Sequence, residues 1–216
     1  YLKKYGRESV YIPYGAPHIE SKNPAILKKY GLQPDGYFFI GSRLEPENHQ
    51  DIVVDAFKQI ETDKFLVIAG GANWKSSYVR KLQEVNDRRI LFLGPVYEPG
   101  HIEELHSSAY AYIHGNEVGG TNPALLKAMG SGNCIIALDV PFNREVLGDA
   151  GLYFKDVAEL KRNIELLLEN QQILNSLRQK AKERARNLYR WEDVVNGYEK
   201  IFMGLKYGKQ KTSDIY

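Results

Sequence analysis

The sequence predicts a doubly wound α/β domain with a parallel sheet and extra C-terminal helices. Three observations lead to this fold class. Short apolar runs of strand length alternate with longer segments of helical period. Glycines follow most of these runs, where a chain leaving a buried strand must turn. After residue 157 the pattern is almost wholly helical, which predicts two or three helices packed together.

The predicted strands are continuous apolar runs rather than alternating ones. Both faces of each strand are therefore expected to be buried, as in a parallel sheet. In such sheets ligands bind at the carboxyl ends of the strands, where the glycines lie. The runs occupy residues 37–40, 65–69, 90–93, 109–113 and 134–138, and the glycines that follow are Gly41, Gly70, Gly71, Gly94 and Gly115.

Helical periodicity fills the intervals at residues 50–60, 78–85, 102–108 and 123–129. Asn23 and Asn122 each precede a proline, which is the order expected for a capping residue before the first helical position. Gly31 and Gly130 are suitable helix stops. The repeated strand and helix order favours a doubly wound sheet.

The 216 residues suit one large domain with a proper core. We expect residues 1–205 to form that domain and residues 206–216 to be a frayed tail. The chain opens on Tyr1 rather than methionine, so we expect a piece of a longer polypeptide with a partner domain on its N-terminal side.

Charge and composition exclude several function classes. The 29 basic and 27 acidic residues are too balanced for a surface that binds nucleic acid as a whole, so an anion site must be local. The basic run at residues 178–190 is either a solvated helix face or a contact with anionic lipid. No apolar run approaches the ~18 residues of a membrane span. Cys134, the only cysteine, stands in an apolar stretch, and we expect a cytoplasmic protein.

The segment from residue 114 to residue 129 is the most informative one. A strand ends at residue 113 and a capped helix begins at residue 123, with Gly119 and Gly120 between them. Free N–H groups and the dipole at a helix N-terminus favour an anion, and a pyrophosphate would fit. Alternatively, the two glycines only shape the loop.

Glu117 adds a carboxylate to this loop. A carboxylate is repelled by phosphates, but it accepts hydrogen bonds from sugar hydroxyls. Taken alone, Glu117 is equally consistent with an exposed loop acid.

Together these motifs resemble the C-terminal domain of retaining glycosyltransferases of the GT-B fold, glycosyltransferase family 4. The similarity covers nearly the whole chain. It includes Tyr-Ile-Pro-Tyr-Gly15 as an entry strand and glycine turn, the arginine loop at 39–48, and two strand and turn motifs at 66–71 and 91–96. Two motifs resemble those of a rhamnosyltransferase branch of this family. They are Pro-Glu-Asn at 46–48 and Val-Gly-Gly-Thr-Asn-Pro at 118–123.

The resemblance implies a Rossmann-like donor-binding half that moves a sugar from a nucleoside diphosphate sugar to an acceptor hydroxyl. It implies that Arg43 binds the diphosphate and that Glu117 contacts the transferred sugar. A glycan or lipid-linked acceptor would bind to an N-terminal domain that this chain does not contain. The isolated chain should therefore bind the donor without transferring its sugar. The implied donor contacts also include Gly15, Gly41, Asn48, Gly71, Val96, Tyr97, Gly119, Gly120, Thr121, Asn122 and Lys127.

Two residues depart from the family pattern. Asn48 stands where the family often has a lysine, which leaves one phosphate charge without a partner. Lys127 stands where a glutamate usually accepts hydrogen bonds from the ribose, and an ammonium group cannot accept them. Lys127 therefore either reaches the diphosphate, marks a changed or weakened nucleotide site, or points to solvent.

No metal or other cofactor is expected. The sequence has no Asp-X-Asp, and its five histidines lack the spacing of metal ligands. His106 and His114 are either bases or hydrogen-bonded structural histidines. A dinucleotide oxidoreductase is disfavoured because Gly-X-Gly-X-X-Gly is absent, whereas a non-catalytic nucleotide-sugar-binding domain stays open because of Lys127 and Asn48.

Overall fold

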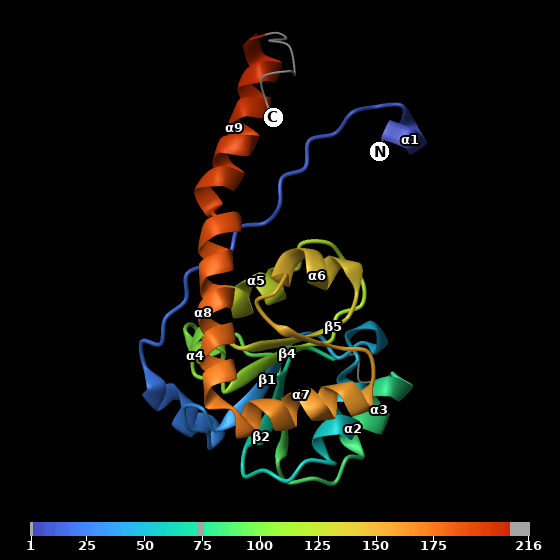
Figure 1. The fold of residues 1–216 in the computed structure, drawn as a ribbon, viewed down its shortest axis with the longest axis vertical. Helices are drawn as coiled ribbons and strands as arrows, with labels where there is room; N and C mark the ends of the chain where they lie inside the picture. The colour runs from blue at the N-terminus through green and yellow to red at the C-terminus, as the bar shows by residue number, and fades with distance from the viewer. Residues whose placement is uncertain (1, 73–75, 208–216) are drawn as a thin grey trace.

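A parallel sheet of six strands lies at the centre of the computed structural model, which describes residues 2–72 and 76–207 (Figure 1). The strand order is β3-β2-β1-β4-β5-β6, so the sheet grows outward from its middle in both directions. This is the predicted doubly wound arrangement. The strands are β1 (Tyr37–Gly41), β2 (Phe65–Ala69), β3 (Ile90–Gly94), β4 (Ala111–His114), β5 (Ile135–Leu138) and β6 (Leu152–Phe154).

Helices cover both faces of the sheet. Side chains of α2, α3 and α7 bury one face, and those of η1, α4, α5 and α6 bury the other. Long α8 contributes to both clusters, and α9 continues away from the sheet (Figure 1). The bounds are α1 (Leu2–Tyr5), η1 (Pro24–Tyr30), η2 (Pro46–Asn48), α2 (Gln50–Phe57), α3 (Ser77–Gln83), α4 (His101–Ser107), α5 (Pro123–Gly130), α6 (Pro141–Leu147), α7 (Val157–Glu169), α8 (Gln171–Leu188) and α9 (Trp191–Tyr207).

Strand β1 shows why the apolar runs are continuous. Phe38 and Ile40 lie in one buried cluster, whereas Tyr37 and Phe39 lie in the other. Successive side chains of a strand point to opposite faces, so a strand covered on both sides needs an apolar residue at every position.

The five predicted strands are confirmed, three of them with an end shifted by one residue, and two larger differences remain. Strand β4 begins at Ala111, two residues later than the apolar run that predicts it. Strand β6 was missed because it has only three residues, too few for a recognisable apolar run. It pairs with β5, with Ala137 opposite Tyr153.

The entry strand inferred for residues 11–15 is wrong. None of the described strands pairs with this segment, and Pro13 has no N–H to donate to a ladder. The chain instead runs along the helical layer, where the Ala16 N–H donates to the Tyr189 carbonyl at 2.7 Å. The Ile19 N–H donates to the Gly130 carbonyl at 3.3 Å.

The helix ends are partly as predicted. Asn122 caps α5 by accepting a hydrogen bond from the Ala124 N–H, and Gly31 ends η1 in the left-handed conformation. Asn23 makes no side-chain cap. Its backbone N–H donates to the Glu104 carboxylate instead, and η1 is a 3₁₀ helix.

Gly130 serves packing rather than helix termination. It is the last residue of α5, and Gly132 is the residue beyond it with a positive φ of 72°. A Cβ atom at Gly130 would lie 1.8 Å from the carbonyl oxygen of Pro17. The glycine therefore lets the N-terminal segment pass directly over the end of α5.

The predicted C-terminal helices are present as α7, α8 and α9. Helix α9 includes Lys206 and Tyr207, and the rest of the predicted tail, residues 208–216, lies outside the described residues. None of the described helices carries a stretch long and apolar enough to cross a bilayer.

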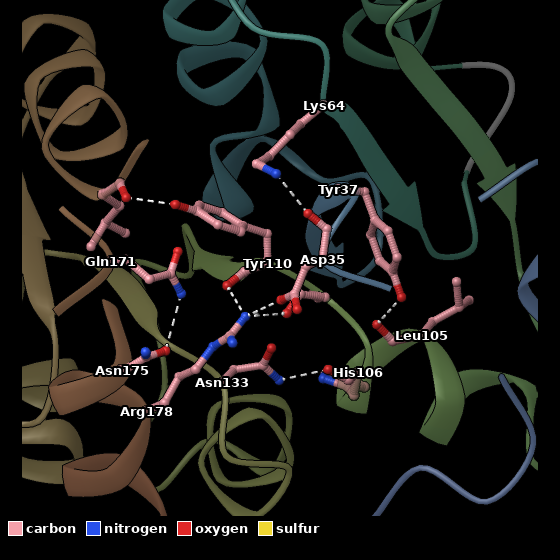
Figure 2. A network of polar contacts seen from close by, with 12 residues as sticks. Asp35, Tyr37, Lys64, Leu105, His106, Tyr110, Asn133, Gln171, Asn175 and Arg178 are labelled. Carbon is pink, nitrogen blue, oxygen red and sulfur yellow. Dashed lines mark hydrogen bonds and ion pairs between the residues drawn. The ribbon is translucent and has the colours of Figure 1, made fainter. Parts of the chain in front are cut away.

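Cations of the basic run on α8 are engaged within the domain. Arg178 donates to the Asp35 carboxylate and to the carbonyls of Ala109 and Tyr110 (Figure 2). Lys180 pairs with Asp149 at 2.8 Å. These contacts favour the helix-face interpretation over a lipid contact.

We predict that Gly70→Ala destabilises the domain by about 2–3 kcal/mol, because a well-packed site must shift to admit the methyl group. A Cβ atom at Gly70 would lie 1.9 Å from the carbonyl oxygen of Ser42. Urea unfolding followed by circular dichroism measures the change.

Gly71→Ala is the matched control, since a Cβ atom there would meet no heavy atom within 4 Å. Its free energy of unfolding should stay within about 0.5 kcal/mol of the wild type. Equal stabilities for the two variants would contradict the described packing of the β2 loop.

Candidate functional site

A hollow of about 390 Å³ opens at the carboxyl ends of β1 and β2, beside the first turns of α5. The strand order reverses next to β1, and doubly wound sheets bind ligands at such a point. The hollow is lined by Gly41, Ser42, Arg43, Ala69, Gly70, Gly71, Pro95, Val96, Tyr97, Ile102, His106, Pro123, Ala124 and Lys127.

The charge of the hollow is positive. Arg43 and Lys127 line it, and none of the described residues that line it is an acid. Within the part of the chain that the structure describes, neither side chain has a hydrogen-bond or ion-pair partner. Two cations that share a hollow without a counter-ion make a site for an anion, and a guanidinium group suits phosphate oxygens in particular.

The backbone of Arg43 is fixed although its side chain is exposed. Its carbonyl oxygen accepts a hydrogen bond from the Asn48 amide at 2.7 Å and another from the Gln50 amide at 2.8 Å. Gln50 is fully buried, and its own amide oxygen accepts a hydrogen bond from the Tyr78 hydroxyl at 3.0 Å. The loop after β1 therefore presents Arg43 from a rigid base.

Two asparagines predicted to contact the donor have other partners. Asn48 is buried and does not line the hollow, because its amide is used to hold the Arg43 carbonyl. Asn122 does not line the hollow either, and its side-chain oxygen accepts from the Ala124 N–H at 2.9 Å. Both side chains therefore make hydrogen bonds to the protein backbone.

The predicted glycines divide into two groups. Gly41 and Gly71 line the hollow, and the absence of any atom within 4 Å of a Cβ at Gly71 leaves its backbone open to a ligand. Gly15 lies elsewhere. A Cβ atom there would lie 2.6 Å from ring carbons of Trp191, so this glycine is needed for packing against α9.

The loop between β4 and α5 borders the hollow without lining it. Gly119 has a φ of 141°, which a residue with a side chain rarely adopts, and Gly120 is exposed. Glu117 is half exposed, and its carboxylate lies 3.2 Å from the His49 Nε2 atom. The Thr121 hydroxyl lies 2.5 Å from that of Tyr11.

Val96 and Tyr97, two of the implied donor contacts, also line the hollow. Val96 is half buried, whereas Tyr97 is 86% exposed. An aromatic side chain with so little packing of its own is free to lie against a flat ligand group.

A family comparison decides the identity. The model of the family described as glycosyl transferases group 1 matches residues 23–188, which contain both cations and the loops that carry them. The chain belongs to this family. It forms the C-terminal half of a GT-B fold, as its sheet indicates.

Relatives of this glycosyltransferase domain are longer proteins. An uncharacterised glycosyltransferase of Methanocaldococcus jannaschii, MJ1069, is 27% identical over 172 residues, which are 76% of this chain and 44% of that protein. The chain therefore spans less than half the length of this relative.

Solved structures share the fold. HepE of Anabaena, solved with UDP and glucose, superposes with a TM-score of 0.77 at 19% identity over 93% of this chain and 57% of that one. A sucrose-phosphate synthase of Thermosynechococcus elongatus gives a TM-score of 0.79 at 20% identity over 97% and 56%.

Two histidines lie buried in an aromatic stack, and one of them, His106, lines the hollow. Tyr112 stacks between His106 and His114, with ring centroids 5.1 Å and 6.1 Å away. Neither ring nitrogen of His114 has a partner among the described residues, and the same holds for Nδ1 of His106. The expectation of hydrogen-bonded rings is thus wrong for His114.

Burial keeps both histidines neutral. It lowers the pKa of His114 to about 3, and together with the smaller effect of Lys127 it lowers the pKa of His106 to about 3. Burial also raises the pKa of the Cys134 thiol to about 12, in agreement with its predicted place in the core.

No group of three or more potential metal-ligating side chains gathers in the described ranges, residues 2–72 and 76–207. The sequence interpretation missed Gln50 and His49. The only available signal was the run of polar residues from Asn48 to Gln50 directly before an apolar helix.

We predict that the stability of the domain falls as the pH drops below the unfolded histidine pKa. His106 and His114 stay neutral when folded but gain protons when unfolded, so the free energy of unfolding should fall by about 1.4 kcal/mol per histidine between about pH 7.5 and 5.5. Urea titrations at both pH values measure this loss.

His114→Phe keeps the ring stack and should remove about 1.4 kcal/mol of the pH-dependent loss. The control is His18→Gln, because the His18 side chain is 52% exposed. A pH dependence unchanged by His114→Phe would show that the buried ring is not neutral.

Proposed function

We propose that the hollow binds a nucleoside diphosphate sugar, and that the chain is the donor half of a retaining enzyme of glycosyltransferase family 4. The main support is the pair of cations formed by Arg43 and Lys127. In the described part of the chain, both line a hollow without acids and neither side chain has a hydrogen-bond or ion-pair partner. The enzyme would transfer a hexosyl or rhamnosyl group in polysaccharide or glycan biosynthesis.

Arg43 would hold the diphosphate. Its guanidinium donates to two phosphate oxygens at once, and the clamped backbone limits the reorganisation needed when charge develops on the leaving diphosphate. The two cations would offset the charge of the diphosphate, so the proposal requires no metal ion or other cofactor.

Lys127 would approach the same phosphates from α5. It lies just over one turn from Pro123, the first residue of the helix, and its long aliphatic stem lets the ammonium reach toward the helix start. The ammonium there would replace the charge that Asn48, a neutral amide, does not supply.

The loop from β4 to α5 would meet the transferred sugar. Glu117 is exposed and would accept hydrogen bonds from sugar hydroxyl groups, while the open backbone at Gly119 and Gly120 leaves room for the sugar. The Thr121 hydroxyl, which lies beside that of Tyr11, would be a further sugar contact. The structures of HepE with UDP and glucose support a nucleotide sugar as the ligand class.

The acceptor would be a glycan or a lipid-linked saccharide bound by an N-terminal domain. This chain matches only 44%, 57% and 56% of the lengths of three relatives, which supports a second domain in the whole enzyme. The enzyme would act in the cytoplasm, at the inner face of the membrane when its acceptor is lipid-linked. The isolated chain should bind donor and transfer nothing.

A non-catalytic nucleotide-sugar-binding domain is the second candidate, because Lys127 occupies a position where the family usually has an acid. The motif Pro-Glu-Asn at 46–48 supports membership of the rhamnosyltransferase branch, and therefore favours a catalytic domain over a non-catalytic one.

Arg43→Ala should weaken the binding of nucleoside diphosphates at least tenfold, because the lost charge-assisted hydrogen bonds are worth about 1.5–3 kcal/mol. Calorimetric titration with the diphosphates of uridine, thymidine and guanosine measures the effect. The fold should persist, since the side chain is exposed. An unchanged affinity for every nucleotide would remove Arg43 from the site.

Lys127→Glu should lower diphosphate affinity and reduce its dependence on salt, because a phosphate cation is lost. If Lys127 instead marks a decayed ribose site, the new carboxylate will bind ribose hydroxyls. Affinity for uridine diphosphate would then rise selectively, since thymidine diphosphate lacks the 2′-hydroxyl. Titration of both nucleotides against both proteins separates these outcomes, and a selective gain would contradict the phosphate role.

A further inference from the structure

His49 has an unusual backbone between η2 and α2. Its φ of 49° and ψ of 38° place it in the left-handed region, where Asp35 is the other described residue that is not a glycine. A side chain disfavours this conformation, and such residues persist only where their surroundings hold them. The contacts of the ring therefore matter.

The His49 ring reaches the neighbouring loop between β4 and α5. Its Nε2 atom lies 3.2 Å from the Glu117 Oε2 atom, and the Glu117 N–H donates to the Glu47 carbonyl at 2.9 Å. A carboxylate only accepts hydrogen bonds, so the His49 nitrogen that faces it must carry a proton. A side-chain contact and a backbone contact thus join the two loops.

The two loops also touch through their backbones. A Cβ atom at Gly115 would lie 2.2 Å from the carbonyl oxygen of Asn48, so a glycine is needed for this approach. Asn48 and Gln50, on either side of His49, both donate to the Arg43 carbonyl. One short segment therefore touches the arginine loop through two side chains and the β4 loop through the third.

We infer that His49 is a positioning residue for Glu117, and that it therefore strengthens binding of the transferred sugar rather than binding of the nucleotide. The inference rests on the proposed function, in which Glu117 contacts that sugar. The ring N–H holds one carboxylate oxygen, which leaves the other oxygen free to accept a hydrogen bond from a sugar hydroxyl.

The test compares sugar nucleotides with free nucleotides. Calorimetry gives the Kd of UDP-glucose and UDP, and of thymidine diphosphate rhamnose and thymidine diphosphate. The ratio of the Kd of the free nucleotide to that of its sugar form is the sugar advantage. The variants are His49→Gly, His49→Gln, Glu117→Ala, and the double variant His49→Gly with Glu117→Ala.

Glycine adopts the left-handed conformation without a side-chain penalty, so His49→Gly should fold while lacking the donor. We expect it to lower the sugar advantage about fivefold, which corresponds to one ordinary hydrogen bond, and to leave free nucleotide affinity within about twofold. His49→Gln places an amide N–H near the position of Nε2 and should restore most of the advantage. The double variant should match Glu117→Ala, because the two residues act together.

Four results would overturn the inference. In the first two, His49→Gly weakens free and sugar nucleotides equally, or lowers the sugar advantage further when Glu117 is absent; either result assigns His49 a structural role. A sugar advantage lowered by Glu117→Ala but untouched by His49→Gly rejects the inference alone. A sugar advantage untouched by Glu117→Ala rejects the proposed sugar contact of Glu117, and the inference fails with it.

Discussion

The carbonyl oxygen of Arg43 accepts hydrogen bonds from two side-chain amides, and the geometry of the candidate site depends on this clamp. Gln50 is fully buried, and its amide group makes hydrogen bonds through both its nitrogen and its oxygen. A buried amide left without partners would cost about 1–3 kcal/mol, so the arrangement is strongly favoured. The fixed backbone directs an exposed guanidinium to the edge of the sheet where the parallel strands end.

The hollow around that guanidinium is positively charged because no acid among the described lining residues balances it. Lys127 adds a second positive charge, and the hollow has no acid among the lining residues within 2–72 and 76–207. His106 lies beneath them as a neutral ring, because burial and, to a smaller degree, Lys127 lower its pKa. The free domain therefore holds two positive charges at one hollow, and a bound anion would offset them. This arrangement of charge supports a diphosphate as the proposed ligand.

The sequence predicts the sheet well because buried parallel strands need apolar residues on both faces, as Tyr37 and Phe38 illustrate. It predicts β6 poorly because three residues carry too little pattern. The sequence also does not reveal which group a side-chain amide is hydrogen-bonded to. Asn48 is read as a ligand contact from its place in a motif, yet its partner is a backbone carbonyl five residues earlier. The contact between His49 and Glu117 depends on one left-handed residue, which no periodicity reveals.

The most direct measurement is a crystal structure of the chain with uridine diphosphate. The account predicts phosphate oxygens at about 2.7–2.9 Å from the guanidinium of Arg43 and from Nζ of Lys127, the range of charge-assisted hydrogen bonds. A second basic hollow, beside the start of α9, is lined by Lys182 and Arg186 among others. A diphosphate bound there, with the hollow at Arg43 empty, would contradict the account.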